Sequence, residues 1–269
     1  MKNMDILFNI FGDNIRIVGG AVRNFLLKKP INDYDFSCLL IPPKIKELLQ
    51  NNNVKYITVG EKFGTITAII DNKKYEITST RKDIKTDGRW TTVEYIADFE
   101  SDSYRRDLTI NGLYQDKNGK IYDYHNGIDD LKNGLIKFIG DPILRIKEDY
   151  LRILRFFRFY TYYGKTIDKD SLKAIIILKK NLKKLTKERI KDEILKIFAT
   201  NCVETLQIVN DIGILDILEI NGNLKNIENF YLIKKFTPII PFGFFIEKIP
   251  EWNFSKKERR NLILLGKSL

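Results

Sequence analysis

The chain has 269 residues, with 46 Lys and Arg against 35 Asp and Glu and a formal net charge of +11. Its two cysteines, Cys38 and Cys202, have no paired spacing, which argues against a disulfide framework or a zinc site and fits a reducing compartment. The sequence shows no secretory signal and no apolar stretch of transmembrane length, so we expect a cytoplasmic protein with no membrane partner. The positive charge makes a nucleic acid or a nucleotide the first partner to test, although Lys and Asn richness also follows from coding composition.

The first part of the chain alternates short β-rich runs with turns. The runs are IRIVGG at 15–20, YDFSCLL at 34–40, VKYITVG at 54–60, FGTITAII at 63–70 and KYEITST at 74–80. The segment AVRNFLLKK at 21–29 is apolar at helical spacing, so the chain opens as strand, Gly-Gly turn, helix, strand. This order predicts an α/β head.

The rest of the chain follows the helical period. Four segments carry apolar residues three and four positions apart. They are 143–163, 170–185, 187–200 and 202–218. The last stretch, from residue 236, is aromatic, contains Pro and then becomes basic, and we predict at most one short helix there. The sequence therefore predicts a helical remainder after the α/β head.

Asp33 and Asp35 lie in INDYDF, directly beside an apolar run. In an extended strand, side chains two positions apart leave the same face. Two carboxylates so close repel one another unless a cation lies between them, and Mg²⁺ suits this role because it binds carboxylate oxygens and keeps positions for phosphates. Glu76, on the face of its strand opposite Tyr75 and Ile77, is the best candidate for a third carboxylate in a two-metal site. By itself, the Asp pair also fits a solvated strand end.

Gly19 and Gly20 lie where the first strand turns into a helix. Glycines there let backbone N–H groups approach a phosphate, and the helix N-terminus adds a favourable dipole. A Gly-Gly pair alone is a weak signal. Followed by Asp-x-Asp on a strand, it predicts a site that holds a nucleoside triphosphate by its phosphates and a metal. Asp71, in contrast, begins DNKK and is expected in a hairpin-like turn.

Five motifs resemble, in order, those of the class II branch of the tRNA nucleotidyltransferase and bacterial poly(A) polymerase family, within the DNA polymerase β superfamily. They are VGGAVRN with DYD, RRDLTINGLY at 105–114, DYHNGIDDL at 123–131, EDYLRILRFFRF at 148–159 and KERIKDEILKIF at 187–198. The stretches EITSTRKDIKTDGR and EDYLRILRFFRFY are more similar to the CCA-adding members than to the poly(A) polymerases.

The resemblance implies an α/β nucleotidyltransferase head (a mixed sheet with helices), a helical neck that recognises the base, and an abbreviated helical body that binds tRNA. We expect them at 1–137, 138–200 and 201–269. The implied reaction is template-independent addition of C, C and A from CTP and ATP to the tRNA 3′ end, with two Mg²⁺ ions and release of pyrophosphate. Alternatives are A addition alone, poly(A) synthesis, or a non-catalytic RNA-binding protein that kept the fold. We expect no DNA partner, and the sequence does not indicate the oligomeric state.

The candidate nucleotide-binding residues combine arginines with acids and amides. Arg105 and Arg106 are suited to binding phosphate, and Asp107 and Asn111 to the sugar, although a strand-end salt bridge explains them equally well from the residues alone. The resemblance favours nucleotide binding. The full candidate set is Gly19, Gly20, Arg23, Arg105, Arg106, Asp107, Asn111, Asp149, Arg152 and Arg155.

Asp149 and Arg152 are three positions apart and are expected to share one helix face. An exposed salt bridge is one interpretation. The other is a protein template for the incoming base, because cytosine and adenine both present an amino donor beside a ring-nitrogen acceptor. Guanine and uracil present the opposite pattern and would leave both side chains unpaired. Glu148 and Arg155 are expected to position this helix.

RKDIKTDGRW at 81–90 is polar and contains glycine, and we predict a flexible loop. In the family, a loop here helps to switch from C to A addition, which makes Arg81, Asp87 and Arg89 its candidate residues. A mobile loop without function is the alternative. His125, the only histidine, is expected to be structural. DYHNGIDDL is expected to form a hinge in which Gly127 turns the chain.

Two features depart from the family pattern. Asn24 stands where the family usually has Asp. The chain also ends well before typical members do, so we expect an abbreviated body, with tRNA held by the basic clusters at 178–191 and 255–260.

Overall fold

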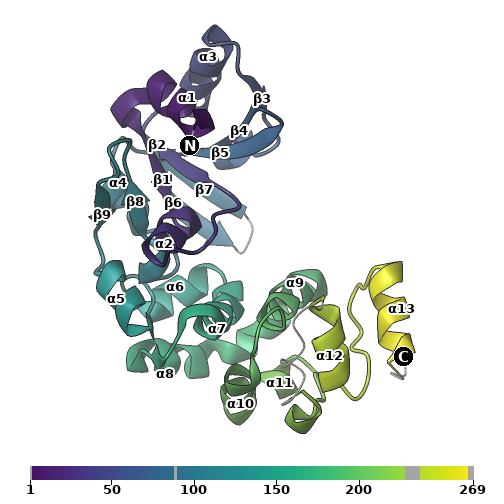
Figure 1. Ribbon diagram of the computed structural model, residues 1–269. Helices are drawn as coiled ribbons and strands as arrows, with labels where there is room; N and C mark the ends of the chain where they lie inside the picture. Colours follow the sequence, from purple (N-terminus) through teal and green to yellow (C-terminus); the bar gives the residue numbers. More distant parts are fainter. Residues whose placement is uncertain (1, 88–89, 228–236, 266–269) are drawn as a thin grey trace. The chain divides into compact units, whose positions relative to one another are not determined.

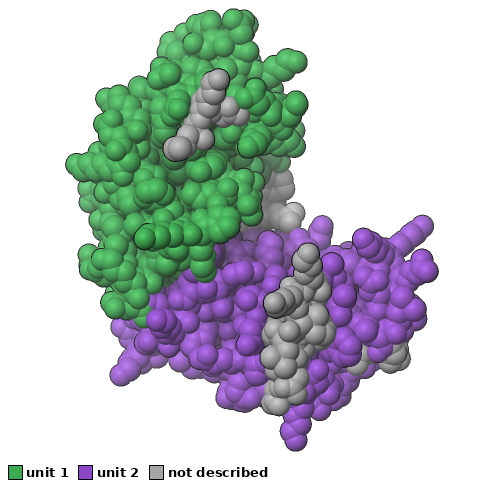
Figure 2. Space-filling model, in the orientation of Figure 1, with its two compact units in different colours: residues 1–133, 137–140 green, residues 134–136, 141–269 purple. Residues whose placement is uncertain are grey.

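The computed structural model describes residues 2–87, 90–227 and 237–265 (Figure 1). The chain divides into two compact units (Figure 2). Unit 1 comprises residues 1–133 and 137–140, and unit 2 comprises residues 134–136 and 141–269. The finer division of the helical part into neck and body stays a prediction. No helix within the described ranges is long and apolar enough to cross a membrane.

Unit 1 contains a seven-stranded sheet in the order β3-β4-β5-β2-β1-β8-β9 (Figure 1). The strands are β1 Ile15–Val18, β2 Asp35–Cys38, β3 Lys55–Ile57, β4 Thr65–Ile70, β5 Lys73–Ser79, β8 Leu113–Gln115 and β9 Ile121–Asp123. Strands β2 and β5 run parallel, whereas the other neighbouring pairs are antiparallel. Each of the five predicted β-rich runs contains one strand, and the predicted mixed sheet is confirmed.

The β4–β5 hairpin shows how alternation assigns side chains to the two faces of the sheet. In β5, Tyr75 and Ile77 are buried, while Glu76 between them is exposed. Asp71 and Asn72 join the strands, with φ of 49° and 59°. Two left-handed residues are what a tight two-residue hairpin requires, and Asp or Asn is favoured there. The predictions for Asp71 and for the face of Glu76 are confirmed.

Helices cover this sheet and build its core. They are α1 Lys2–Phe11, α2 Gly20–Leu26, α3 Pro42–Asn51, α4 Phe99–Ser103 and α5 Gly127–Asn133, with 3-10 turns η1 Gly12–Asn14, η2 Glu61–Phe63 and η3 Thr109–Asn111. Leu7 of α1 and Ile45 of α3 are fully buried in one apolar cluster with sheet residues such as Ile17 and Phe36. Burying these side chains holds the sheet against the helices and supports the strand ends that carry the site.

A separate two-stranded sheet follows β5. It consists of β6 Arg81–Asp87 and β7 Trp90–Tyr95, which pair antiparallel with a register shift between Asp83 and Lys85. The structure therefore differs from the prediction of a flexible loop, because both described arms of this segment are strands. Arg89, one of the residues predicted to act in that loop, lies outside the described residues.

Within its described residues, unit 2 is helical apart from one short ladder and an isolated bridge between Gly222 and Ile246. Its elements are α6 Pro142–Glu148, α7 Leu151–Tyr163, α8 Lys169–Leu178, η4 Lys179–Lys184, α9 Lys187–Ile197, α10 Val203–Asp211, α11 Ile214–Ile217, η5 Leu224–Asn226, α12 Ile239–Phe245 and α13 Lys256–Leu264. The ladder pairs β10 Leu135–Ile136 with β11 Thr166–Ile167 in parallel.

Three details of unit 2 differ from the predicted helices. Asp149, with φ of −154° and ψ of 110°, separates α6 from α7, so 143–163 is not one helix. Gly213, with a left-handed φ of +71°, lies between α10 and α11, so 202–218 is not one helix either. Two helices, α12 and α13, occupy the final stretch instead of at most one. A capping box between Ser255 and Glu258 starts α13.

Candidate active site

Asp35 and Glu76 are register partners on the parallel strands β2 and β5. Asp33 lies two residues earlier, in the segment that leads into β2, and all three residues are exposed. The pKa of Asp35 is raised above 3.8, first by desolvation and then by the negative charges of Glu76 and Asp33, while Arg106 acts in the opposite direction. The negative charges of the other two predicted catalytic carboxylates thus act on Asp35.

Carboxylates on paired positions of neighbouring strands suit a divalent cation. In the described part of the chain, no three His, Cys, Asp or Glu side chains are grouped so that they could hold a metal by themselves. Mg²⁺ does not need such a group, because it commonly binds one or two carboxylates and completes its shell with water and substrate phosphates. Asp33 and Asp35 fit this mode of binding and would hold the metal, with Glu76 beside them.

The turn between β1 and α2 requires Gly19. Its φ of +69° is one that L side chains rarely adopt, and its N–H donates to the carbonyl oxygen of Leu113 at 3.0 Å. A Cβ built on Gly19 would lie 3.7 Å from the backbone oxygen of Asn111 and 3.9 Å from Nη1 of Arg106. Gly20 follows as the first residue of α2. The glycine turn therefore lies beside two other predicted nucleotide-binding residues.

Arg23, Asn111 and Asp107 form a hydrogen-bonded chain. Nη1 of Arg23 donates to Oδ1 of Asn111, and Nδ2 of Asn111 donates to Oδ1 of Asp107 at 3.1 Å. All three residues are buried. Asp107 also accepts a 2.9 Å hydrogen bond from the N–H of Leu108. This chain ties η3 to α2 and holds the backbone of Asn111 against the glycine turn.

Asn24 uses both ends of its amide. Its Nδ2 donates to the carbonyl oxygen of Pro30 at 3.1 Å, and its Oδ1 accepts from Nη2 of Arg23 at 3.5 Å. Pro30 precedes the segment that carries Asp33. An aspartate could accept from Arg23 but has no N–H for Pro30. The asparagine therefore supplies a bond between α2 and the approach to the carboxylates that an aspartate could not make.

Asp102 of α4, which was not singled out from the sequence, contacts two predicted nucleotide-binding residues, Arg105 and Arg106. It is 0 % exposed, yet Nε of Arg105 donates to its Oδ1 at 2.8 Å and Nη2 of Arg106 donates to its Oδ2 at 3.4 Å. Its other donors are Oγ of Ser37 at 3.2 Å, Oη of Tyr114 at 2.8 Å and the N–H of Arg81 at 3.1 Å. Burial alone would raise the pKa of Asp102, but the two guanidinium groups outweigh burial and hold this pKa below its ordinary value.

Arg81 was predicted to act in a loop, and the structure attaches it to the head. Besides its N–H bond to Asp102, its Nη1 donates to the carbonyl oxygen of Phe63. His125, which the sequence assigned a structural role, has Nε2 2.7 Å from Oγ of Ser103 and packs edge-on against Tyr104. None of these contacts involves Asp33, Asp35 or Glu76.

The segment DYHNGIDDL lies inside unit 1. Asp123 caps α5 by accepting from the N–H of Gly127 at 2.9 Å, and Asp130 accepts from Oγ1 of Thr109 at 2.6 Å. The left-handed residue of the turn is Asn126, with φ of 58°, and not Gly127 as predicted. Gly127 is required for a different reason, because a Cβ there would lie 2.2 Å from the backbone oxygen of Thr109.

In unit 2, the predicted template pair has separate partners. Oδ2 of Asp149 accepts a 2.6 Å bond from Nη2 of Arg189 on α9, and Oδ1 accepts from the N–H of Leu151. Nη1 of Arg152 donates to Oε2 of Glu148 and to the carbonyl oxygen of Arg145. Asp149 lies in the break before α7, so the two side chains do not share a helix face as predicted. Each is nevertheless held by a charged neighbour.

Arg155, the remaining candidate of this group, is half-buried in α7, with its guanidinium 5.5 Å from the ring centroid of Phe159.

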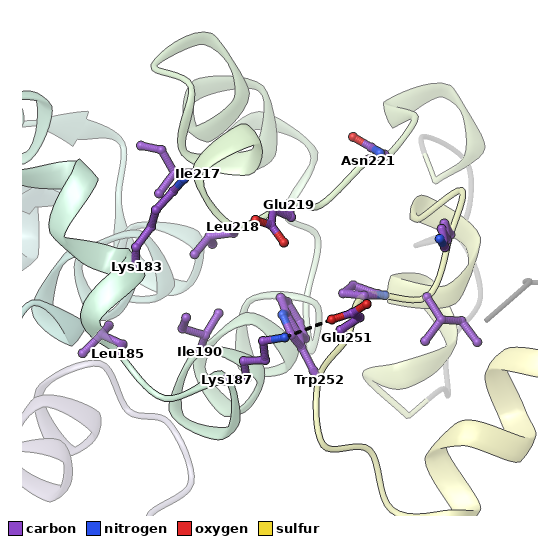
Figure 3. A pocket seen from close by; sticks show the side chains of 13 residues that line it. Lys183, Leu185, Lys187, Ile190, Ile217, Leu218, Glu219, Asn221, Glu251 and Trp252 are labelled. Atoms are coloured by element: carbon purple, nitrogen blue, oxygen red, sulfur yellow. Dashed lines mark hydrogen bonds and ion pairs between the residues drawn. The ribbon is translucent and has the colours of Figure 1, made fainter.

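Unit 2 also contains an open pocket of about 460 Å³ (Figure 3). Its wall includes the buried Ile190, Leu218 and Trp252. Lys183, Lys187 and Lys248 line it as well, together with Glu219 and Glu251, and Nζ of Lys187 lies 3.4 Å from Oε2 of Glu251. None of the predicted catalytic or nucleotide-binding residues lines this pocket.

The mixed sheet with its covering helices fits the fold of a nucleotidyltransferase head. Residues 15–137 match the model of the poly(A) polymerase head domain, and residues 164–220 match the probable RNA and SrmB-binding site of polymerase A. The chain therefore belongs to the tRNA nucleotidyltransferase and poly(A) polymerase family, in its class II branch.

Curated relatives and solved structures agree with this assignment. The chain is 39 % identical over 243 residues to the human mitochondrial CCA tRNA nucleotidyltransferase 1, covering 87 % of this chain and 55 % of that protein. It is 39 % identical over 183 residues to the CCA-adding enzyme of Oceanobacillus iheyensis, covering 67 % of this chain and 45 % of that protein. The chain thus spans about half the length of these relatives.

Among solved structures, the CCA-adding enzyme of Bacillus stearothermophilus in complex with CTP matches with a TM-score of 0.69 and 27 % identity, over 80 % of this chain and 53 % of that chain. The Thermotoga maritima CCA-adding enzyme complexed with tRNA matches with a TM-score of 0.71 at 19 % identity, over 97 % of this chain and 66 % of that one, which supports the fold.

Proposed function

We propose that the protein is a CCA-adding tRNA nucleotidyltransferase, which transfers C, C and A from CTP and ATP to the tRNA 3′ end. The observation that carries this proposal is the register pairing of Asp35 with Glu76, with Asp33 close by and Arg106 acting on the same carboxylate. Relatives that cover most of this chain are named for this activity.

In the proposed reaction, the 3′-hydroxyl oxygen of the RNA attacks the α-phosphorus of the nucleotide. The bond from the α-phosphorus to the bridging oxygen breaks, and pyrophosphate leaves. Bound Mg²⁺ would favour deprotonation of the hydroxyl and neutralise the departing pyrophosphate. Asp33 and Asp35 would hold the metal, while Arg106 would bind phosphate oxygens beside the Gly19 turn, where the missing side chain leaves room for them.

Base selection is assigned to Asp149 and Arg152. A carboxylate has about four acceptor positions and a guanidinium five donors, so the bonds to Arg189 and Glu148 leave capacity for a base. Asp149 would accept from the amino group of cytosine or adenine, and Arg152 would donate to the adjacent ring nitrogen. Guanine and uracil would present a donor to Arg152 and an acceptor to Asp149, which leaves buried polar groups unpaired.

The tRNA would be held by unit 2 through its backbone phosphates. Lys183, Lys187 and Lys248 line the pocket of Figure 3 and are exposed. Lys191, counted in the same basic cluster from the sequence, is buried and donates to Glu258 at 3.2 Å, so it is excluded from this surface. We also infer a cytoplasmic location, which the two buried free thiols fit.

The proposal is tested with three tRNA transcripts, ending at the discriminator base, at C and at CC. Each is incubated with the protein, Mg²⁺ and single or combined nucleotides, and the 3′ ends are sequenced. We expect C, C and one A on the first transcript. Extension of the CC-ended transcript alone would indicate an A-adding enzyme, long A tracts would indicate a poly(A) polymerase, and no extension would refute the catalytic proposal.

Two Asp→Asn variants, one at the predicted metal site and one far from it in sequence, show whether the activity depends on the predicted catalytic carboxylates. Asp35→Asn is expected to abolish extension. Asp71→Asn removes the same charge from the β4–β5 turn, where Asn tolerates the left-handed backbone, and is expected to keep full activity.

A further inference from the structure

Asp102 is a buried charge whose partners come from four separate segments. It accepts hydrogen bonds from β2 through Ser37, from β6 through Arg81, from β8 through Tyr114 and from the turn after α4 through Arg105 and Arg106. A carboxylate removed from water is costly unless it is fully paired, and this one is paired at both oxygens.

Arg106 connects Asp102 to the predicted phosphate site. Its Nε donates to Oη of Tyr114 at 3.0 Å, and the same hydroxyl donates to Oδ2 of Asp102. Its Nη1 lies beside the turn, 3.9 Å from the position of a Cβ on Gly19. Its charge also opposes the rise in the pKa of Asp35. One guanidinium is therefore held by a buried anion and lies beside the glycine turn.

We propose that Asp102 is a positioning residue for the triphosphate of the incoming nucleotide. It acts by holding Arg105 and Arg106 in a fixed geometry, so that less side-chain freedom is lost when phosphate oxygens bind. Asp102 itself does not touch the substrate. This inference rests on the proposed function, because it assumes that the phosphates bind at the Gly19 turn.

The direction in which Asp102→Asn changes the affinity for CTP distinguishes a positioning role of Asp102 from an effect of its negative charge alone. If Asp102 contributed only its negative charge, then Asp102→Asn would make the site more positive and tighten CTP binding. If Asp102 positions the arginines, the same variant weakens CTP binding, because the guanidinium groups lose their anionic anchor. A purely structural role would lower thermal stability without changing the affinity of the folded protein.

The test measures CTP and tripolyphosphate binding by calorimetry in Mg²⁺, and kcat and KM for CTP, for wild type and Asp102→Asn. We expect the Kd of both ligands to rise about tenfold or more, with a matching rise in KM for CTP. The control is Asp98→Asn, which removes a charge from the N-cap of the same helix, where Asn caps equally well. Its Kd is expected to stay within about twofold of wild type.

A second pair of variants tests whether Asp102 acts through Arg106. Arg106→Ala alone should weaken CTP binding, and adding Asp102→Asn to it should change the Kd by less than about twofold, because residues in one network are not additive. Tyr114→Phe removes one hydrogen bond from each partner and should give a smaller rise in Kd in the same direction. If Asp102→Asn does not fold, the CTP affinity of Tyr114→Phe is measured in its place.

Several outcomes contradict the inference in distinguishable ways. If wild type binds CTP but Asp102→Asn binds it equally or more tightly, the positioning role is refuted while the proposed function stands. If Tyr114→Phe has to carry the test and binds CTP as wild type does, the positioning role is refuted as well. If wild type binds neither CTP nor tripolyphosphate, the proposed function fails together with the inference.

Discussion

Arg189 of α9 is joined to Asp149 by a 2.6 Å bond from Nη2 to Oδ2. Asp149 lies outside any helix, between α6 and α7. Its carboxylate is held by this ion pair and by a hydrogen bond from the N–H of Leu151. The orientation of a predicted base-reading side chain thus depends on a residue of another helix.

Arg189→Ala should therefore loosen base selection. Without the ion pair, Asp149 is free to rotate, and the penalty against uracil and guanine falls. We expect the ratio of kcat/KM for CTP over UTP to drop at least about tenfold, while the protein stays folded. Asp192→Ala, an exposed change on the same helix, should leave the ratio unchanged, and an unchanged ratio in Arg189→Ala would argue against the role of Asp149.

Metal addition should stabilise the protein through Asp35. Because the carboxylates repel one another without a cation, Mg²⁺ is expected to raise the thermal unfolding midpoint of wild type in a concentration-dependent way. Asp35→Asn should lose most of this shift and reduce transfer activity by about 100-fold or more. Asp71→Asn serves as the control in differential scanning fluorimetry. A full Mg²⁺ shift in Asp35→Asn would place the metal elsewhere.

Gly127→Ala should destabilise unit 1, since the added Cβ would lie 2.2 Å from the backbone oxygen of Thr109. We expect a loss of about 1–3 kcal/mol in the free energy of unfolding, from overpacking. Thr109 begins η3, which also holds Asn111, so CTP binding should weaken as well. The comparison is Gly140→Ala, where φ is +68° but nothing lies within 4 Å, so the cost there is backbone strain alone.

His125 gives a clean pH dependence because it is the only histidine. Its pKa is lowered from 6.5 by desolvation, which outweighs the charges of Asp123 and Glu100. The unfolded chain therefore binds a proton at a higher pH than the folded chain, and stability is lost as pH falls from 6.5 through the lowered folded pKa. Chemical denaturation of wild type should show this loss, and His125→Gln should lack it.

Lysines at the unit 2 pocket should contribute to tRNA affinity through counterion release. Lys183→Ala and Lys248→Ala are each expected to weaken tRNA binding and to reduce the slope of log K against log salt by about 1. Lys173→Ala, on α8 and paired with Asp170, is the control. Unchanged slopes in both variants would exclude this surface.

The sequence predicted features that depend on strict local periods. The alternation of β5 placed Glu76 opposite Tyr75, because a strand repeats every two residues. The same argument does not reach Asp33, because β2 begins only at Asp35, and the shared face of the two aspartates stays a prediction. The separation of Asp149 from Arg152 was not predictable in this way. The apolar helical pattern continues through the break, while the backbone at Asp149 turns extended.

Asp102 and the β6–β7 hairpin were missed for different reasons. The spacing of Asp102 to Arg105 and Arg106 was visible, but burial of the carboxylate depends on Ser37 and Tyr114, which are distant in sequence. Strand β6 contains a single apolar residue, Ile84, and the pairing of such a segment depends on a partner strand rather than on an apolar face.

The parallel pairing of β2 with β5 has a consequence for folding kinetics. Parallel neighbours cannot be joined by a tight turn, and α3, β3 and β4 lie between β2 and β5 in the sequence. Contacts of such high sequence separation close large loops and form slowly. The acidic pair should therefore assemble late in folding, and affinity for Mg²⁺ should appear only when unit 1 has reached its native topology.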